Sequence, residues 1–385
     1  MYNRHIKVTI DMSDAHYAGR RDPRRIIVAV AIIMSVSVAA YAIWVWPKPK
    51  LLVYTYDSFL AWGDNPETID SEVFGPFMRQ YGVEVQIVRL QSDASGIVSR
   101  LVAEAERPVA DVVIGIDNIL ILQSAAQSVT EPYIPSTLNN VNASLVDALD
   151  PDHHVVPFDF GLVTIVYSQS KINETVHPEL ANLTFADLAN HEMASSLVTE
   201  NPLLSSPGLS FLLTQIAVYE KLLSQDWKTW WSQVKGYIDV QAGWTEAWTK
   251  WISDPTRQML VSYGTDPAYS YYTTNATPDT RLAPMYHNGS HYAWMQVEGI
   301  GLVKNGPNPT LARAFIDYCL TSSVQSYIGL NQWMFPAGNQ ISLHEAFTYA
   351  LHLNEVAILN DLLTRNEIAA NLTTWLTAWD TIMST

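Results

Sequence analysis

The sequence predicts an α/β protein with a parallel, doubly wound sheet and two lobes, preceded by one transmembrane helix. Two observations carry this prediction: an uncharged segment at residues 26–46, and a strand–helix–strand–helix–strand order over residues 51–117. About 335 residues follow this segment and a short spacer. That length is enough for two lobes at ~100–200 residues each.

The uncharged segment runs from Ile26 to Trp46 and matches the ~20 apolar residues that span a bilayer. Four arginines between residues 20 and 25 place residues 1–25 in the cytoplasm and the rest outside, extracellular or periplasmic. The alternative is a signal peptide cleaved after Ala42, in the small-x-small sequence Ala40-Tyr41-Ala42. The apolar run exceeds the ~7–15 residues of a usual signal-peptide core, which favours a single-pass anchor in the cell membrane. Residues 47–50 alternate proline and lysine and form a stiff linker.

The external part of the chain is acidic. The whole chain has a net charge of −16, and its first 25 residues hold six basic and three acidic residues, so the remainder carries −19. Nucleic-acid affinity comes from neutralising phosphates, so this charge argues against a nucleic-acid partner. It is compatible with a cationic ligand.

The single cysteine, Cys319, excludes an internal disulfide, and its apolar neighbours predict a buried position. Asn-x-Ser/Thr sequons are compatible with a glycosylated external domain, or with chance in an Asn- and Thr-rich chain. There are six, at Asn142, Asn173, Asn182, Asn275, Asn288 and Asn371.

Hydrophobic periodicity predicts the order of elements along the external part. Strands are expected at 51–56, 83–88, 111–116, 162–167, 197–199, 259–263 and 292–303. Helices are expected at 72–81, 94–105, 206–222, 309–319 and over most of 345–385. Pro157 and Gly161 flank Phe158-Asp159-Phe160, a pattern that predicts a crossover between the lobes.

Polar and aromatic residues follow the predicted strands, where α/β folds bind their ligands. They are Tyr56, Asp57, Ser58 and Trp62, then Asp117 and Asn118, then Trp244 and Glu246, then Tyr263, Thr265, Asp266 and Tyr269. Ring faces attract a cation and carboxylates supply the opposite charge, so this set suits a flat organic cation. The alternative is that these rings only pack at lobe edges.

Ser205 and Ser206 precede Pro207-Gly208, which is a favourable helix start. The free N–H groups of such a start can bind an anion, although most such caps bind nothing. Nucleophile-elbow, zinc-protease and phosphate-loop motifs are absent from the sequence, so no enzyme, cofactor or metal is predicted. An extracellular hydrolase stays as an alternative that would need a nucleophile–base pair.

Short motifs over residues 51–340 resemble, in the same order, the thiamine-binding substrate-binding proteins of ABC importers. They are Val53-Tyr54-Thr55-Tyr56-Asp57-Ser58-Phe59 with Trp62, residues 110–118, residues 156–161, residues 206–209, residues 243–247, residues 260–263 with 267–269, residues 291–298, and Asn331-Gln332-Trp333-Met334-Phe335-Pro336.

The resemblance implies a two-lobed periplasmic-binding-protein-like fold of type II. Residues 51–156 and 290–385 would form lobe 1, and residues 157–289 would form lobe 2. It implies a monomeric receptor that captures thiamine, or its phosphates, for an ABC transporter permease. Tyr56, Trp62, Trp244, Tyr263 and Tyr269 would then form aromatic walls around thiamine. Ser205 and Ser206 would face its hydroxyethyl or phosphate end, and Thr265 would add a polar contact.

The chain also departs from the family pattern. Gly264-Thr265-Asp266 stands where the family tends to have Thr-Thr-Ser. A carboxylate at Asp266 would repel a phosphorylated ligand if it faced the ligand, or it would cap the helix that begins at Pro267. Gln91–Ser95 corresponds to a family Glu-Asp-Gly segment with one extra residue, which makes Asp93 a further candidate. The alternative ligands on the same fold are a polyamine, or ferric iron bound by Tyr269, Tyr271 and Tyr272.

Overall fold

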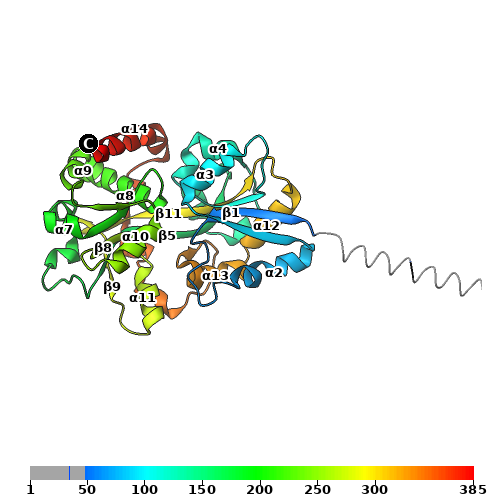
Figure 1. Cartoon of the computed structure of the whole chain (residues 1–385), viewed down its shortest axis with the longest axis horizontal. Coiled ribbons are helices and arrows are strands. Elements are labelled where there is room, and N and C mark those ends of the chain that lie inside the picture. Colours follow the sequence, from blue (N-terminus) through cyan, green and yellow to red (C-terminus); the bar gives the residue numbers. More distant parts are fainter. Residues whose placement is uncertain (1–33, 35–47) are drawn as a thin grey trace, which may run out of the picture. The chain divides into compact units, whose positions relative to one another are not determined.

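Two long antiparallel strands, β5 (Val156–Ser168) and β11 (Ser290–Val303), lie side by side at the centre and connect two lobes (Figure 1). The structure is a computed structural model that describes Met34 and residues 48–385. The predicted cytoplasmic tail, the predicted transmembrane helix apart from Met34, and the signal-peptide cleavage site lie outside the described residues. Within the described part of the chain, no helix is both long enough and apolar enough to cross a membrane.

The first lobe is built on three parallel strands. β1 (Lys50–Tyr56) pairs with β2 (Glu84–Leu90) on one side and β3 (Val112–Asp117) on the other. Helices α3 (Ala94–Ala103) and α2 (Ile69–Tyr81) lie on opposite faces of this sheet (Figure 1). The predicted order of strands and helices in this region is confirmed, with shifts of a few residues at the boundaries.

The complete sheet is mixed, with the order β2-β1-β3-β11-β5-β8-β6-β7. β11 runs antiparallel to both β3 and β5, and β5 runs antiparallel to β8 (Met259–Tyr263). The parallel pairing predicted from residues 51–117 is confirmed for β1, β2 and β3, and the antiparallel centre of the complete sheet was not predicted. Periodicity identifies a strand but does not give the direction of its neighbours.

The second lobe repeats the strand–helix arrangement. β6 (Leu197–Glu200) pairs in parallel with β7 (Asp239–Gln241) and with β8. Its longer helices carry the second wall of the central cavity: α8 (Ser206–Ile216), α10 (Trp244–Ser253) and α11 (Asp266–Thr274). The core behind α8 is aromatic, where Phe211 contacts Trp230 and Trp231 of α9 (Lys228–Val234).

The chain returns to the first lobe through α12 (Pro309–Cys319) and α13 (Ser322–Gln332), where Cys319 is buried as predicted. The helix expected over most of residues 345–385 is found as three short 3₁₀ turns followed by one long α-helix, with β13 (Ala357–Ile358) among the turns and paired with β11. Tertiary pairing overrides local helix propensity in this stretch.

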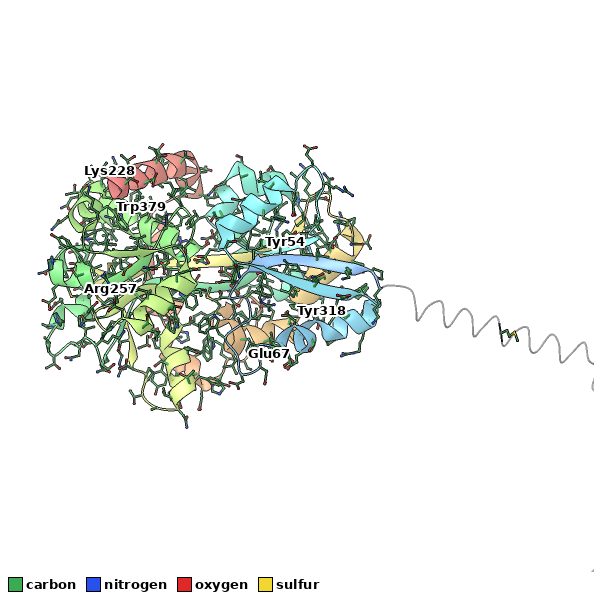
Figure 2. The ribbon with its side chains drawn as sticks, viewed as in Figure 1. Tyr54, Glu67, Lys228, Arg257, Tyr318 and Trp379 are labelled. Carbon is green, nitrogen blue, oxygen red and sulfur yellow. The ribbon has the colours of Figure 1, made fainter. Side chains whose placement is uncertain are left out.

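The last helix, α14 (Arg365–Ser384), packs against α9 of the second lobe through Trp379 and Trp231 (Figure 2). Its first residue, Arg365, donates a hydrogen bond to the carbonyl of Leu149 in the first lobe. For the lobe boundaries we therefore propose one change from the expected division: residues 365–385 belong with lobe 2.

The remaining elements are short. They are η1 (Leu120–Leu122), α4 (Ser124–Val129), β4 (Thr130–Glu131), η2 (Leu138–Asn140), α5 (Ala143–Leu149), η3 (Pro178–Asn182), α6 (Phe185–Leu188), α7 (His191–Ser196), the π-helix η4 (Ala217–Leu223), β9 (Thr280–Ala283), β10 (Met285–His287), β12 (Phe335–Pro336), η5 (Glu345–Tyr349), η6 (Leu353–Glu355) and η7 (Leu359–Asp361).

Candidate functional site

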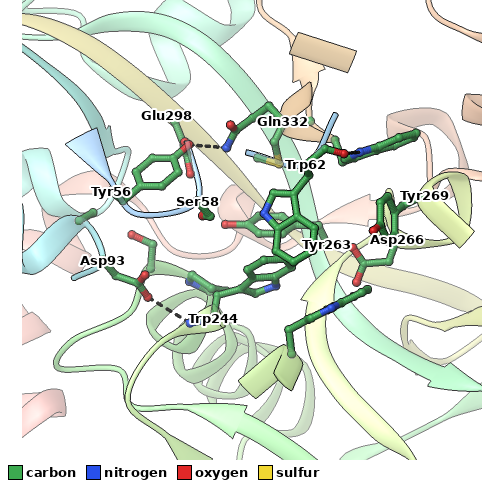
Figure 3. Close-up of a pocket in the computed structure, with 16 residues that line it drawn as sticks. Tyr56, Ser58, Trp62, Asp93, Trp244, Tyr263, Asp266, Tyr269, Glu298 and Gln332 are labelled. Atoms are coloured by element: carbon green, nitrogen blue, oxygen red, sulfur yellow. Dashed lines mark hydrogen bonds between the residues drawn. The ribbon is translucent and has the colours of Figure 1, made fainter. Parts of the chain in front are cut away.

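A cavity lies between the lobes and encloses about 700 Å³ of space free of protein atoms, part of it open to solvent (Figure 3). Its lining comes from both lobes and from the central strand β11. The lining residues are Tyr56, Ser58, Trp62, Asp93, Ala94, Ser206, Pro207, Trp244, Trp248, Tyr263, Asp266, Tyr269, Glu298, Gln332, Trp333 and Met334.

Tyr56 reaches the cavity because β3 leaves room for its ring. Gly115 of β3 has φ +108°, and a Cβ added there would come within 2.6 Å of the Tyr56 ring. Only glycine combines this backbone conformation with so close an approach. The Tyr56 hydroxyl donates a hydrogen bond to Oε2 of Glu298 (2.6 Å) and accepts one from Nε2 of Gln332 (2.6 Å). A residue of β1 is thus fixed to the crossover strand β11.

Four rings form an aromatic cluster on the other side of the cavity: Trp62, Trp244, Trp248 and Tyr269. Trp62, from the loop after β1, lies edge-on to the other three, with ring centroids 5.4–5.9 Å away. Trp244 stacks on Trp248, one helical turn along α10, at 5.3 Å. Nε1 of Trp244 donates to the Ser262 hydroxyl (2.9 Å), which holds the indole in place. The cluster therefore combines one ring from lobe 1 with three from lobe 2.

Three carboxyls line the same cavity: Asp93, Asp266 and Glu298. Burial raises the pKa of Asp93 to about 6 and that of Asp266 to about 7. Burial also raises the pKa of Glu298 to about 7, partly opposed by the hydrogen bond from Tyr56. Among the sixteen lining residues there is no lysine, arginine or histidine. Negative charge in this cavity therefore has no neighbouring side-chain cation to balance it.

Two more carboxyls lie buried behind the lining. Asp159 of β5 is opposite Glu298 in the sheet register, and neither of its oxygens has a hydrogen-bond partner. Burial, and then the nearby Glu298, raise the pKa of Asp159 well above its usual range. Glu200, at the end of β6, is fully buried with both oxygens unpaired, and burial raises its pKa in the same way.

The structure places eight of the twelve predicted site residues in the cavity lining. They are Tyr56, Trp62, Asp93, Ser206, Trp244, Tyr263, Asp266 and Tyr269. Their contact with a ligand stays a prediction. Asp266 does not cap the helix: it is the first residue of α11, after the N-cap Thr265, and it faces the cavity. Its Oδ2 is buried without a hydrogen-bond partner.

The other four predicted residues lie outside the lining. Asp57 is half-buried and accepts a hydrogen bond from Thr245 of α10 (3.4 Å). Asp117 is buried behind Ser206, accepting from its hydroxyl and from the N–H groups of Ile119 and Leu120. Ser205 is the buried N-cap of α8, and Thr265 donates to the carbonyl of Trp333. The polar groups of Asp57, Asp117 and Thr265 are thus used in hydrogen bonds within the protein, whereas the Ser205 hydroxyl is buried without a partner.

Ser58, named among the strand-end residues, also lines the cavity. Seven further lining residues were not among the predicted site residues: Ala94, Pro207, Trp248, Glu298, Gln332, Trp333 and Met334. A helical spacing of four from Trp244 could have identified Trp248. Glu298 lies in the middle of β11, where no strand-end rule applies. Gln332 ends α13, Trp333 and Met334 follow it, and only tertiary packing brings them to the cavity.

The three tyrosines considered for ferric iron do not converge. Tyr269 faces the cavity, but the hydroxyl of Tyr272 donates to Asp64 (2.8 Å) and that of Tyr271 to Glu345 (3.4 Å). Within the described part of the chain, no group of three or more His, Cys, Asp or Glu residues is arranged to hold a metal ion.

Comparison with known proteins gives a consistent result. The sequence model described as bacterial extracellular solute-binding protein matches residues 107–355. The thiamine-binding periplasmic protein of Brucella suis is 28% identical over 330 residues, which cover 86% of this chain and 90% of that protein. The protein of the same name from Escherichia coli is 29% identical over 335 residues, covering 87% and 93%.

Solved structures extend the likeness to three dimensions. A periplasmic thiamin binding protein superposes with a TM-score of 0.73 at 27% identity, covering 88% of this chain and 97% of that one. A ferric binding protein from Campylobacter jejuni superposes with a TM-score of 0.66 at 18% identity, covering 86% and 99%. The second likeness shows a shared fold and no more.

Proposed function

This chain belongs to the bacterial extracellular solute-binding protein family, and from that premise we propose that it captures thiamine outside the cytoplasm for an ABC importer. It is a binding protein and not an enzyme. The predicted resemblance to thiamine-binding proteins is confirmed by relatives that match most of its length.

One observation carries the choice of ligand: an aromatic cluster faces carboxyls that have no basic neighbour in the cavity lining. Thiamine joins a positively charged thiazolium ring to an aminopyrimidine ring. Indole and phenol faces attract such a cation, and carboxyl oxygens accept hydrogen bonds from an amino group. Partial burial strengthens both contacts because water competes less for the charge.

We assign roles to the lining residues on this basis. Trp62, Trp244, Tyr263 and Tyr269 provide ring faces, and Tyr56 closes the opposite end through its bond to Glu298. Asp93, Asp266 and Glu298 provide negative charge. Ser206 lies where the hydroxyethyl group would reach α8.

The cellular setting is part of the same proposal. A single-pass anchor at residues 26–46 holds a monomeric receptor at the outer face of the cell membrane, and an ABC transporter permease accepts the ligand from it. The four arginines before residue 26 support this orientation.

Titration of the full-length protein tests the ligand. Tryptophan fluorescence should change on addition of thiamine, because three of the four rings in the cluster are indoles. Ferric iron and spermidine should neither cause the change nor compete with it. Trp62→Ala should weaken the response, whereas Tyr237→Ala, which removes an exposed ring outside the cavity, should not. A response to spermidine or ferric iron without one to thiamine would contradict the proposal.

A further inference from the structure

We infer that this cavity selects an unphosphorylated cation, so that free thiamine binds in preference to thiamine monophosphate or pyrophosphate. The inference rests on the proposed function and adds the ligand form that the cavity rejects. It is based on the carboxyl groups that lie beside the N-termini of the helices around the cavity.

Four helices begin at the cavity wall. The first residues of α3, α8, α10 and α11 are Ala94, Ser206, Trp244 and Asp266, and each of them lines the cavity. A helix N-terminus has free N–H groups and a partial positive charge, which together favour a phosphate. Four such ends would make a strong phosphate site if nothing else occupied them.

At each of these helix ends the chain supplies its own carboxyl. Asp93 stands at the N-cap position of α3, and its Oδ2 accepts a hydrogen bond from the N–H of Trp244 at the start of α10 (3.3 Å). Asp117 accepts the hydroxyl hydrogen of Ser206 at the start of α8. Asp266 is itself the first residue of α11.

A further carboxyl lies beneath α8. A Cβ added at Gly208 would come 3.0 Å from Cβ of Glu200, so this fully buried side chain lies directly under the first turn of the helix. A phosphate carries a charge of about −1.5 to −2 near neutral pH and would enter among these groups without a side-chain cation to accept it. These helix N-termini thus already have carboxyl groups beside them before any ligand binds.

Asp266 is the group in direct reach of a ligand. Its side chain is 5% exposed, its Oδ2 has no hydrogen-bond partner, and it lies in the cavity wall beside Tyr269 (Figure 3). An unpaired buried acceptor favours a cation or an N–H or O–H donor. A fully ionised phosphate offers only further acceptors, so Asp266 discriminates against it.

Calorimetric titration of the full-length protein at pH 7.5 and fixed ionic strength tests the inference. Thiamine should bind at least tenfold more tightly than thiamine pyrophosphate, and inorganic pyrophosphate should not displace it. Asp266→Asn should reduce the ratio of the two affinities at least threefold. Glu67→Gln removes one negative charge from an exposed position on the surface before α2 and should leave the ratio unchanged (Figure 2).

The outcomes separate the two proposals. Equal affinities for thiamine and thiamine pyrophosphate would overturn the selectivity alone. Failure to bind any of the three thiamine forms would overturn the proposed function and the selectivity with it. Asp266→Ser provides a second variant with a smaller side chain. An unchanged ratio in both variants, each folded by circular dichroism, would overturn the role of Asp266.

Discussion

Removal of the Trp244 ring should weaken thiamine binding by about 1–3 kcal/mol. A cation over an indole face contributes about 0.5–2 kcal/mol depending on its exposure to water, and a second aromatic contact about 0.5–1.5 kcal/mol. At about 1.4 kcal/mol for each factor of ten, the dissociation constant should rise roughly 5- to 150-fold.

The surroundings of Trp244 indicate that the loss acts on binding more than on folding. The indole is only half-buried, and its neighbours Trp62 and Trp248 belong to the same cluster. Its hydrogen bond to the buried Ser262 hydroxyl also disappears in Trp244→Ala. Trp244→Phe keeps a ring face without that N–H, and should recover most of the lost affinity.

Fluorescence or calorimetric titration of wild type, Trp244→Ala, Trp244→Phe and Tyr237→Ala measures the effect. Circular dichroism and thermal melting confirm that each variant is folded. An affinity within twofold of wild type in folded Trp244→Ala would refute the aromatic cluster as a source of binding energy. A loss of equal size in Tyr237→Ala would show that the assay reports something other than the cavity.

Three further predictions concern motion, pH and the cysteine. The lobes should close by bending near residues 158–161 and 262–264, so small-angle scattering should show contraction on addition of thiamine, and identical profiles would argue against closure. The carboxyl pKa values in the folded protein are raised to about 6 for Asp93 and about 7 for Asp266 and Glu298. These groups therefore bind protons more tightly in the folded state than in the unfolded state. Stability from these groups is therefore full below their unfolded pKa of about 4 and is lost as pH rises to about 7, so the melting temperature without ligand should fall less over this range in Asp266→Asn. Cys319 is fully buried, and burial raises its pKa well above the usual range, so a thiol reagent should modify it only after denaturation; rapid labelling of the native protein would contradict the structure.

The sequence predicts the lining residues near strand ends better than those within β11 or after α13. Residues at or shortly after the ends of strands, such as Tyr56, Trp62 and Tyr263, reach the cavity because these strand ends lie at the lobe boundary. Glu298 lies within a strand, and Trp333 depends on how α13 packs, so neither follows from local pattern. Asp117 and Thr265 also follow strands, but internal hydrogen bonds use their polar groups. A strand-end rule gives the neighbourhood of a side chain and not its direction.

The direction of the central strands shows the same limit. The apolar residues 292–303 predict a strand, which the structure shows as β11. Its antiparallel pairing with β3 and β5 depends on contacts with segments far away in the sequence. Similarly, residues 345–364 have a composition compatible with helix, yet β13 pairs with β11 there. Contacts between segments far apart in sequence decided both outcomes.

The two strands that connect the lobes are hydrogen-bonded to each other, from Trp294–Val163 to Ile300–Val156. Lobe movement must therefore bend a two-stranded ribbon, because neither strand is free to swivel as a lone linker would. Bending a hydrogen-bonded pair of strands strains it, and the strain favours a return to the unbent conformation. Contacts with the ligand would stabilise the closed, strained conformation, and release of the ligand would let the lobes open again. The free receptor would then return to the open conformation, ready to bind ligand again.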